Sequence, residues 1–228
     1  MSLFAIGDPH LSFSTDKPMN VFKGWDNYVE RFEKNWKNIV TEDDTVVIAG
    51  DVSWAMSLKE AKADFEFINS LPGQKIILKG NHDYWWDTKT KMEKFFADNN
   101  FDTLHILFNN AYKIGDISVC GTRGWFYDDN TEDKNKVILR EAGRLRTSIK
   151  AAKELGGTPV VFLHYPPITQ LAKCDEIYNV LVENDIEICY YAHLHSYSTR
   201  NAVTGLHEGI KFSLISSDYL EFCPKKIS

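Results

Sequence analysis

Residues 75–83 read Lys-Ile-Ile-Leu-Lys-Gly-Asn-His-Asp, a short apolar run that ends in a glycine and three polar side chains. Such a run is typical of a strand that is covered on both faces. A turn after the strand has a use for Gly80 and Asn81, but it has no need of His82 and Asp83. This stretch therefore indicates a strand whose end carries chemistry.

Four other places in the chain carry similar polar residues just after an apolar run. They are Gly7-Asp8-Pro9-His10, Gly50-Asp51, His164 and His193-Leu194-His195. Ligands of open α/β sheets collect outside the carboxyl ends of the strands, so we expect the five loops to surround one small volume. Five of the seven histidines fall in these motifs, and only His105 and His207 lie outside them. Unrelated structural histidines would be scattered more evenly.

Each motif has a structural alternative when it is taken alone. An Asp-x-His pair arises often by chance, and Gly50-Asp51 could form a turn in which the carboxylate bonds its own backbone. His164 could be a structural histidine at a bend of the chain. His193 and His195 could point inward from a strand toward carbonyl groups. The interpretation as one site therefore depends on all five motifs together.

The motifs supply carboxylates, imidazoles and one amide oxygen. This set of oxygen and nitrogen donors suits Mn, Fe or Zn and differs from the all-oxygen cage of a calcium site. A single carboxylate such as Asp51 can bind two ions through its two oxygens. Two metal ions about 3.5 to 4 Å apart lower the pKa of a shared water and hold a phosphoryl group in line. The sequence therefore predicts a two-metal centre suited to phosphoester hydrolysis.

Apolar runs alternate with amphipathic stretches along the chain. The expected strands are 3–6, 45–49, 75–78, 104–108, 111–114, 117–120, 160–163 and 187–191. The expected helices are 25–40, 57–71, 88–99, 131–155 and 175–184. Helices between strands favour an α/β architecture, whereas the close spacing of the three runs in 104–120 indicates antiparallel hairpins. We therefore expect a mixed sheet in a single domain of residues 1–228.

The composition limits the classes of function. A formal net charge of −6 argues against a large nucleic-acid footprint, which normally requires a basic face. No apolar segment approaches the ~18 residues of a membrane span, and the N-terminus lacks the basic region of a signal peptide. The four cysteines are widely spaced and do not suggest disulfides. We therefore expect a protein of the reducing cytoplasm without a membrane segment.

The motifs, in their order and spacing, resemble those of the calcineurin-like metallophosphoesterase superfamily over residues 8–195. The resemblance implies a four-layer αββα sandwich in which two mixed β-sheets are flanked by helices. It assigns Asp8, His10 and His195 to one metal ion and Asn81, His164 and His193 to the other, with Asp51 as the bridge. It further implies that a metal-bridging hydroxide attacks phosphorus, while His82 protonates the leaving oxygen or stabilises the developing charge.

The chain departs from the family pattern in two places. The Ser/Thr protein phosphatases of the superfamily carry a further Asp and an Arg after the bridging residue, but here Asp51 is followed by Val52-Ser53-Trp54-Ala55. Protein phosphatase activity is therefore not expected, and the partner that would orient His82 is not identified. The last motif begins with Ala192 where the family usually has Gly, which slightly crowds the turn.

Further side chains are expected to border the same opening. Arg123 follows a predicted strand on a glycine-flanked loop and could bind phosphate through two parallel hydrogen bonds, or it could form a surface ion pair. Several aromatic residues could form a rim that contacts the substrate, or they could belong to the core. These are Trp54, Tyr84, Trp85, Trp86, Trp125, Phe126 and Tyr127.

The expected partner of this site is a small phosphoester. One alternative is a scaffold or binding protein that keeps the fold without catalysis; such members have lost metal ligands, whereas this chain has a suitable residue at all seven positions. A second alternative is a nuclease on the same fold, because the segment 134–153 carries seven Lys and Arg residues that could form a basic helix face. Such a row is more often simply solvated.

Overall fold

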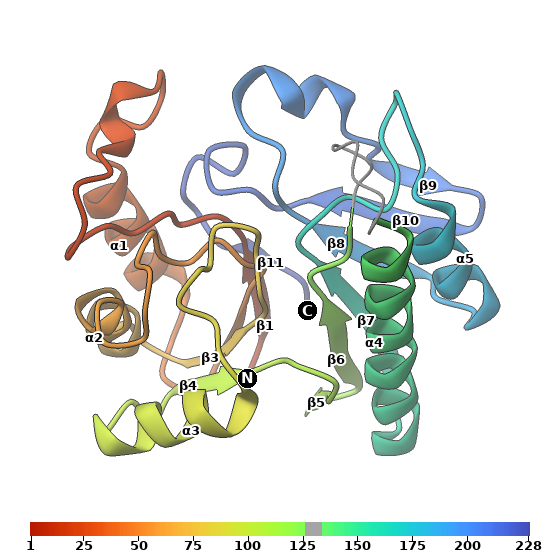
Figure 1. Ribbon diagram of the computed structural model, residues 1–228, viewed down its shortest axis with the longest axis horizontal. Coiled ribbons are helices and arrows are strands. Elements are labelled where there is room, and N and C mark those ends of the chain that lie inside the picture. Colours follow the sequence, from red (N-terminus) through yellow and green to blue (C-terminus); the bar gives the residue numbers. More distant parts are fainter. Residues whose placement is uncertain (126–133) are drawn as a thin grey trace.

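The computed structural model describes residues 1–125 and 134–228, and it contains two β-sheets that face each other (Figure 1). The first sheet has the order β11 (Lys225–Lys226), β1 (Leu3–Ile6), β2 (Thr45–Ile48), β3 (Gln74–Ile77) and β4 (Leu104–Ile106). The second has the order β5 (Tyr112–Ile114), β6 (Ile117–Thr122), β7 (Thr158–Leu163), β8 (Ile188–Tyr191), β10 (Ile210–Leu214) and β9 (Gly205–His207).

Both sheets are mixed, as the sequence predicted. In the first sheet β1 to β4 are parallel, and only β11 runs antiparallel to β1. In the second sheet β6, β7, β8 and β10 are parallel, whereas β5 and β9 run antiparallel at the edges. The central parallel strands are buried on both faces, which explains their nearly continuous apolar sequences.

Helices cover the outer face of each sheet, so the molecule has four layers (Figure 1). The helices are α1 (Tyr28–Ile39), α2 (Lys62–Ser70), α3 (Lys89–Asp98), α4 (Lys134–Leu155) and α5 (Asp175–Glu183), with short 3-10 helices at η1 (Met19–Val21) and η2 (Ser196–Asn201). One apolar core lies between α1, α2, α3 and the first sheet, and another lies between α4, α5 and the second. A third core fills the space between the sheets, which confirms the αββα sandwich. Within the described residues, no helix combines the length and apolar character needed to cross a bilayer.

The structure corrects the sequence prediction in several places. The run 104–108 does not form a hairpin with 111–114, because β4 pairs in parallel with β3 while β5 begins the second sheet. The chain crosses between the sheets at that point, and only the β5–β6 hairpin is confirmed. Helix α2 begins at Lys62, five residues after the predicted start at 57. The start predicted for α4, at 131–133, lies outside the described residues.

Three strands near the C-terminal end were not predicted. Strand β10 carries a signal that could have identified it, since Ile210, Phe212 and Leu214 are buried and alternate with more polar positions. Strands β9 and β11 are too short for a periodic pattern, with three and two residues. Because β10 pairs in parallel with β8, it directs residues 215–218 toward the same edge as the predicted metal ligands.

The Asp83 carboxylate joins the loops that follow β2 and β3. Its Oδ2 accepts hydrogen bonds from the backbone N–H of Asp51 at 2.8 Å and of Gly80 at 2.7 Å. Its Oδ1 accepts from the N–H groups of Val52 at 2.8 Å and Ser53 at 3.3 Å and from the indole Nε1 of Trp85 at 2.8 Å. The carboxylate is completely buried, so these five donors depend on it for an acceptor.

Burial and the neighbouring Asp51 carboxylate raise the pKa of Asp83 to about 6, although its hydrogen bonds act in the opposite direction. Gly80 leaves the space that this arrangement needs. A Cβ on Gly80 would lie 2.0 Å from Asp51 Oδ1 and 2.2 Å from Asp51 N. The glycine of the motif is therefore required by the close approach of the two loops, beyond any need of the turn itself.

We predict that Asp83→Asn lowers the free energy of unfolding by about 3 kcal/mol, because an amide nitrogen would replace an acceptor that serves two buried N–H groups. Thermal or urea unfolding of the metal-free chain measures the change without reference to activity. Asp98→Asn is the matched control, since that carboxylate is exposed and pairs with Lys94 on the same helix. Equal stability of the two variants would show that Asp83 does not hold the loops together.

Candidate metal centre

All the predicted ligands lie in loops that leave the carboxyl ends of parallel strands. Asp8 and His10 follow β1, Asp51 follows β2, Asn81 follows β3, His164 follows β7, and His193 and His195 follow β8. Strands β1, β2 and β3 are neighbours in the first sheet, and β7 and β8 are neighbours in the second. The two facing sheets therefore bring these side chains together at one edge of the sandwich.

The first cluster consists of Asp8, His10 and His195. One potential ligand atom from each residue lies within 4.8 Å of the others. The side chain of Asp8 is completely buried, and its Oδ2 is 3.5 Å from His195 Nε2. The same oxygen accepts a hydrogen bond of 3.0 Å from the N–H of His193, which fixes the carboxylate against the loop from the second sheet.

The second cluster consists of Asp51, His164 and His193, whose potential ligand atoms also lie within 4.8 Å of one another. Asn81 joins it, because its Oδ1 is 2.7 Å from His164 Nε2. Asp51 Oδ2 lies 3.5 Å from His164 Nε2 and 3.8 Å from His10 Nε2. The Asp51 carboxylate therefore stands between the two clusters and faces an imidazole of each.

Hydrogen bonds behind two of the imidazoles fix which ring nitrogen faces the clusters. His164 Nδ1 donates to Ala49 O at 3.0 Å, and His195 Nδ1 donates to Asp218 Oδ1 at 2.8 Å. In the neutral rings, Nε2 is then left as an acceptor that points into the site. This is the arrangement in which a histidine binds a metal ion while its other nitrogen is held by a carbonyl or carboxylate.

Several buried polar atoms in the clusters have no hydrogen-bond partner. Among the described residues, Asp8 Oδ1, His10 Nδ1 and His195 Nε2 are buried without a hydrogen-bond partner. Each such group costs about 1–3 kcal/mol when it stays unpaired. Asn81 Oδ1 also faces the acceptor nitrogen of His164 at hydrogen-bond distance. These acceptors fit cations, and their mixture of oxygen and nitrogen suits transition metals.

Burial and neighbouring charges shift the pKa values of the site residues in different directions. Burial alone lowers the pKa of His195, but the carboxylates of Asp8 and Asp218 outweigh burial and raise it to about 10. Burial and the neighbouring Asp8 carboxylate raise the pKa of Asp51 well above its usual value. Burial is also the main reason that the pKa of His193 falls to about 3. A carboxylate-rich centre of this kind favours a cation at its middle.

The backbone of the site is strained at four of the predicted ligands. Asp8, His10, Asp51 and His193 have φ angles of 56°, 46°, 50° and 73°, in the left-handed region that non-glycine residues seldom adopt. Each costs of order 1–3 kcal/mol and persists only where surrounding contacts hold it. Four of the described non-glycine residues with positive φ thus lie in the two clusters, while the others lie elsewhere in the chain.

His82 borders both clusters without belonging to either. Its backbone N–H donates to Asp51 Oδ1 at 2.7 Å, and its half-buried ring lies 5.7 Å from the ring of His10. The ring packs against Trp54 with a centroid distance of 4.3 Å. Trp54 also stacks on His10 at 5.0 Å, with 21° between the planes. This indole stands three residues after Asp51, in the segment where the protein phosphatases carry the missing carboxylate.

The Arg123 side chain is directed toward α4 and is largely buried. Its Nη2 lies 3.8 Å from Glu141 Oε1, and its guanidinium is 4.7 Å from the ring of Trp125. Its backbone carbonyl accepts hydrogen bonds from the N–H groups of the predicted ligand His164 and of Tyr165. The ion pair is the alternative role that the sequence left open for Arg123.

The aromatic residues divide between the core and the opening. Trp85 is buried, and Trp86 packs against the same core. Trp54 contacts the imidazoles directly, while Tyr84 is half exposed and lies 6.2 Å from the ring of His82. Phe126 and Tyr127 lie outside the described residues.

Asp218 is a residue of the site that sequence reasoning missed. Its Oδ1 accepts from His195 Nδ1, and its Oδ2 accepts from the N–H of Ser196, both at 2.8 Å. It follows β10, the strand that the sequence prediction omitted. Had the alternation in 210–214 been used to place a strand beside β8, Asp218 would have been found at a strand end like the other motifs.

Comparison with known proteins supports the resemblance of the motifs. Residues 1–197 match the model of the calcineurin-like phosphoesterase family. A comparison with curated proteins gives no match. Among solved structures, the phosphopantetheinyl hydrolase of Mycobacterium tuberculosis aligns with a TM-score of 0.53 and 13% identity, over 99% of this chain and 95% of that chain.

Two further structures are similar in fold. A protein of Thermus thermophilus aligns with a TM-score of 0.56 and 13% identity, over 85% of this chain and 81% of that chain. A protein of unknown function from Aquifex aeolicus aligns with a TM-score of 0.50 and 13% identity, over 99% and 95%. At 13% identity these structures are evidence for the fold alone. The family model matches most of the chain and is evidence for the family. The chain belongs to the calcineurin-like phosphoesterase family.

Proposed function

We propose that the chain is a binuclear metal-dependent phosphoesterase, and the position of the Asp51 carboxylate between two His/Asp clusters is the observation that carries this proposal. The first ion would be held by Asp8, His10 and His195 and the second by Asn81, His164 and His193, and Asp51 would contribute to both. The donor set suits Mn, Fe or Zn.

Two bound ions would supply an activated water and would neutralise charge on the phosphoryl group. The residues of the chain keep the donors in place, since Ala49 and Asp218 orient two imidazoles and Asp83 fixes the loop that carries Asp51. His82 gives a proton to the leaving oxygen. Its ring lies beside the clusters but belongs to neither, so it stays available for this role. Trp54 replaces the usual carboxylate as the support of that ring.

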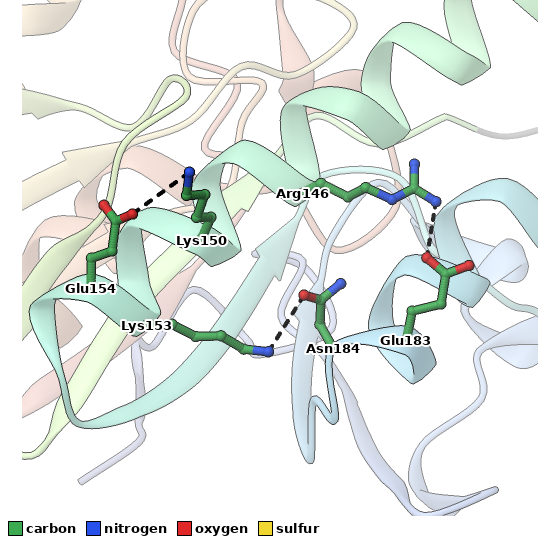
Figure 2. A pocket seen from close by; sticks show the side chains of 6 residues that line it. All are labelled: Arg146, Lys150, Lys153, Glu154, Glu183 and Asn184. Atoms are coloured by element: carbon green, nitrogen blue, oxygen red, sulfur yellow. Dashed lines mark hydrogen bonds and ion pairs between the residues drawn. The ribbon is translucent and has the colours of Figure 1, made fainter.

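A small phosphoester is the proposed substrate, as opposed to a nucleic acid. The basic residues of α4 that raised the nuclease alternative are partly neutralised on the surface between α4 and α5. Figure 2 shows Arg146 paired with Glu183 at 3.0 Å, Lys150 with Glu154 at 3.8 Å and Lys153 with Asn184 at 3.4 Å. The name of one structural neighbour, phosphopantetheinyl hydrolase, is consistent with hydrolysis but fixes no substrate for this chain.

Two broader properties complete the proposal. The proposal includes a single domain of residues 1–228, which the apolar core between the two sheets supports. The four cysteines form no disulfide among the described residues, and three of them are buried, which suits a reducing cytoplasm.

The function is tested with metal-reconstituted protein on p-nitrophenyl phosphate and bis-p-nitrophenyl phosphate, together with metal analysis. We expect Asp51→Asn to reduce both bound metal and activity, because it weakens the bridge. His82→Ala should keep its metal and lose roughly 10²- to 10⁴-fold in kcat, the usual contribution of a general acid. A metal-loaded protein that is inactive on every phosphoester tested would exclude the enzyme and favour the scaffold.

Asp218 should act on the metal through His195. We predict that Asp218→Ala lowers metal affinity by roughly 10- to 100-fold, because the imidazole loses the partner that orients its Nε2. Asp218→Asn should lose less, since its amide oxygen still accepts from Nδ1. Calorimetric titration of the metal-free protein measures the affinity directly, with the α5 surface variant Asp175→Ala as control. Unchanged affinity in Asp218→Ala would remove it from this role.

A further inference from the structure

A pocket of about 250 Å³ opens directly beside the first cluster. It is lined by Lys23, Ser196, Tyr197 and Arg200. Ser196 is the residue after His195, and its N–H donates to the same Asp218 that holds the His195 ring. Lys23, which also lines the pocket, is two residues before Trp25, whose indole lies 5.8 Å from the His195 ring. The pocket therefore adjoins the candidate centre.

The charge of this pocket is positive and uncompensated. Lys23 and Arg200 line it without any acidic residue, and neither forms an ion pair or side-chain hydrogen bond among the described residues. The pocket between α4 and α5 provides the contrast, because each of its three cations has an oxygen partner (Figure 2).

Tyr197 adds a flat surface to the pocket. Its side chain is 75% exposed, and the Arg200 guanidinium lies 5.0 Å from its ring centroid. An exposed aromatic ring next to a guanidinium provides stacking area together with hydrogen-bond donors. Ser196 directly follows His195, and its backbone lies in the left-handed region with φ of 50°. The loop that carries His195 therefore also forms part of the pocket.

We propose that this pocket binds a second anionic group of the substrate, a phosphate or a carboxylate, carried on a planar or apolar part that packs on Tyr197. The inference rests on the proposed function and narrows its substrate class to small phosphoesters with two anionic groups. Arg200 and Lys23 bind the group that is not hydrolysed, while the metal centre takes the scissile phosphoryl group. The small volume of the pocket fits a compact group better than a polymer.

The test compares two ligands that differ by one phosphate, adenosine 5′-monophosphate and adenosine 3′,5′-bisphosphate. Calorimetry on the metal-loaded protein gives the ratio of their dissociation constants. We expect the wild-type protein to bind the bisphosphate at least tenfold more tightly. Arg200→Ala and Lys23→Ala should each reduce this ratio about tenfold, which corresponds to the loss of one charge-assisted hydrogen bond.

Two further variants sharpen the comparison. Arg200→Lys keeps the charge and should retain part of the ratio. Lys150→Ala removes a cation from the pocket of Figure 2 and should leave the ratio unchanged. A wild-type ratio near one, or a ratio that neither Arg200→Ala nor Lys23→Ala alters, overturns the proposal. An equal loss for Lys150→Ala would mean that the effect is one of overall charge, which also overturns it.

Parallel assays with chromogenic esters separate this proposal from the proposed function. If the protein hydrolyses these esters but binds the monophosphate and the bisphosphate equally well, only the second subsite is refuted. If the protein prefers the bisphosphate but hydrolyses no ester, the anion-binding pocket is supported and the phosphoesterase function is refuted.

Discussion

The Asp83 carboxylate accepts five hydrogen bonds from the loops after β2 and β3, and the geometry of the candidate centre depends on it. Both loops turn sharply at their strand ends, so their N–H groups have no strand partners there. One buried acceptor satisfies them and draws the loops together until Gly80 touches Asp51. The strained backbone of Asp51 is tolerated under this constraint, and its carboxylate is directed between the clusters.

The contact between the two sheets is the second requirement, because each cluster takes ligands from both. Gly7 N–H donates to Ile215 O at 2.6 Å, and Ser217 Oγ donates to Gly7 O at 2.6 Å. These bonds join the end of β10 to the end of β1. A Cβ on Gly7 would lie 2.5 Å from Ala192 Cβ. The alanine that replaces the usual glycine of the last motif therefore fits because position 7 has no side chain.

The sequence could predict the motifs, most of the strands and their convergence, because these depend on local patterns. An apolar run followed by Asp or His identifies a strand end without knowledge of its neighbours. The partner of β4 could not be predicted, since runs 104–108 and 111–114 are adjacent in sequence but belong to different sheets. Asp218 was missed because its strand was missed. The role of Asp83 as a shared acceptor could not be predicted either, because its hydrogen-bond donors lie up to 32 residues away in the sequence.

This chain differs from the protein phosphatases in where positive charge lies near the candidate centre. Those enzymes carry an Arg after the bridging Asp, whereas this chain has Trp54 and Ala55 there and supports the imidazoles with an indole. In the proposed function, the phosphate group of the substrate would then be bound by cations other than this arginine. Arg123 is engaged by Glu141 and Trp125, so its guanidinium is already committed. Lys23 and Arg200 line the pocket next to Ser196 without an ion pair among the described residues, on the side of His195, where the loop after β8 leaves the sheet. If the proposed subsite binds an anion, the substrate carries negative charge beyond its scissile group, and the basic pocket then supplies positive charge that the motif lacks without its arginine.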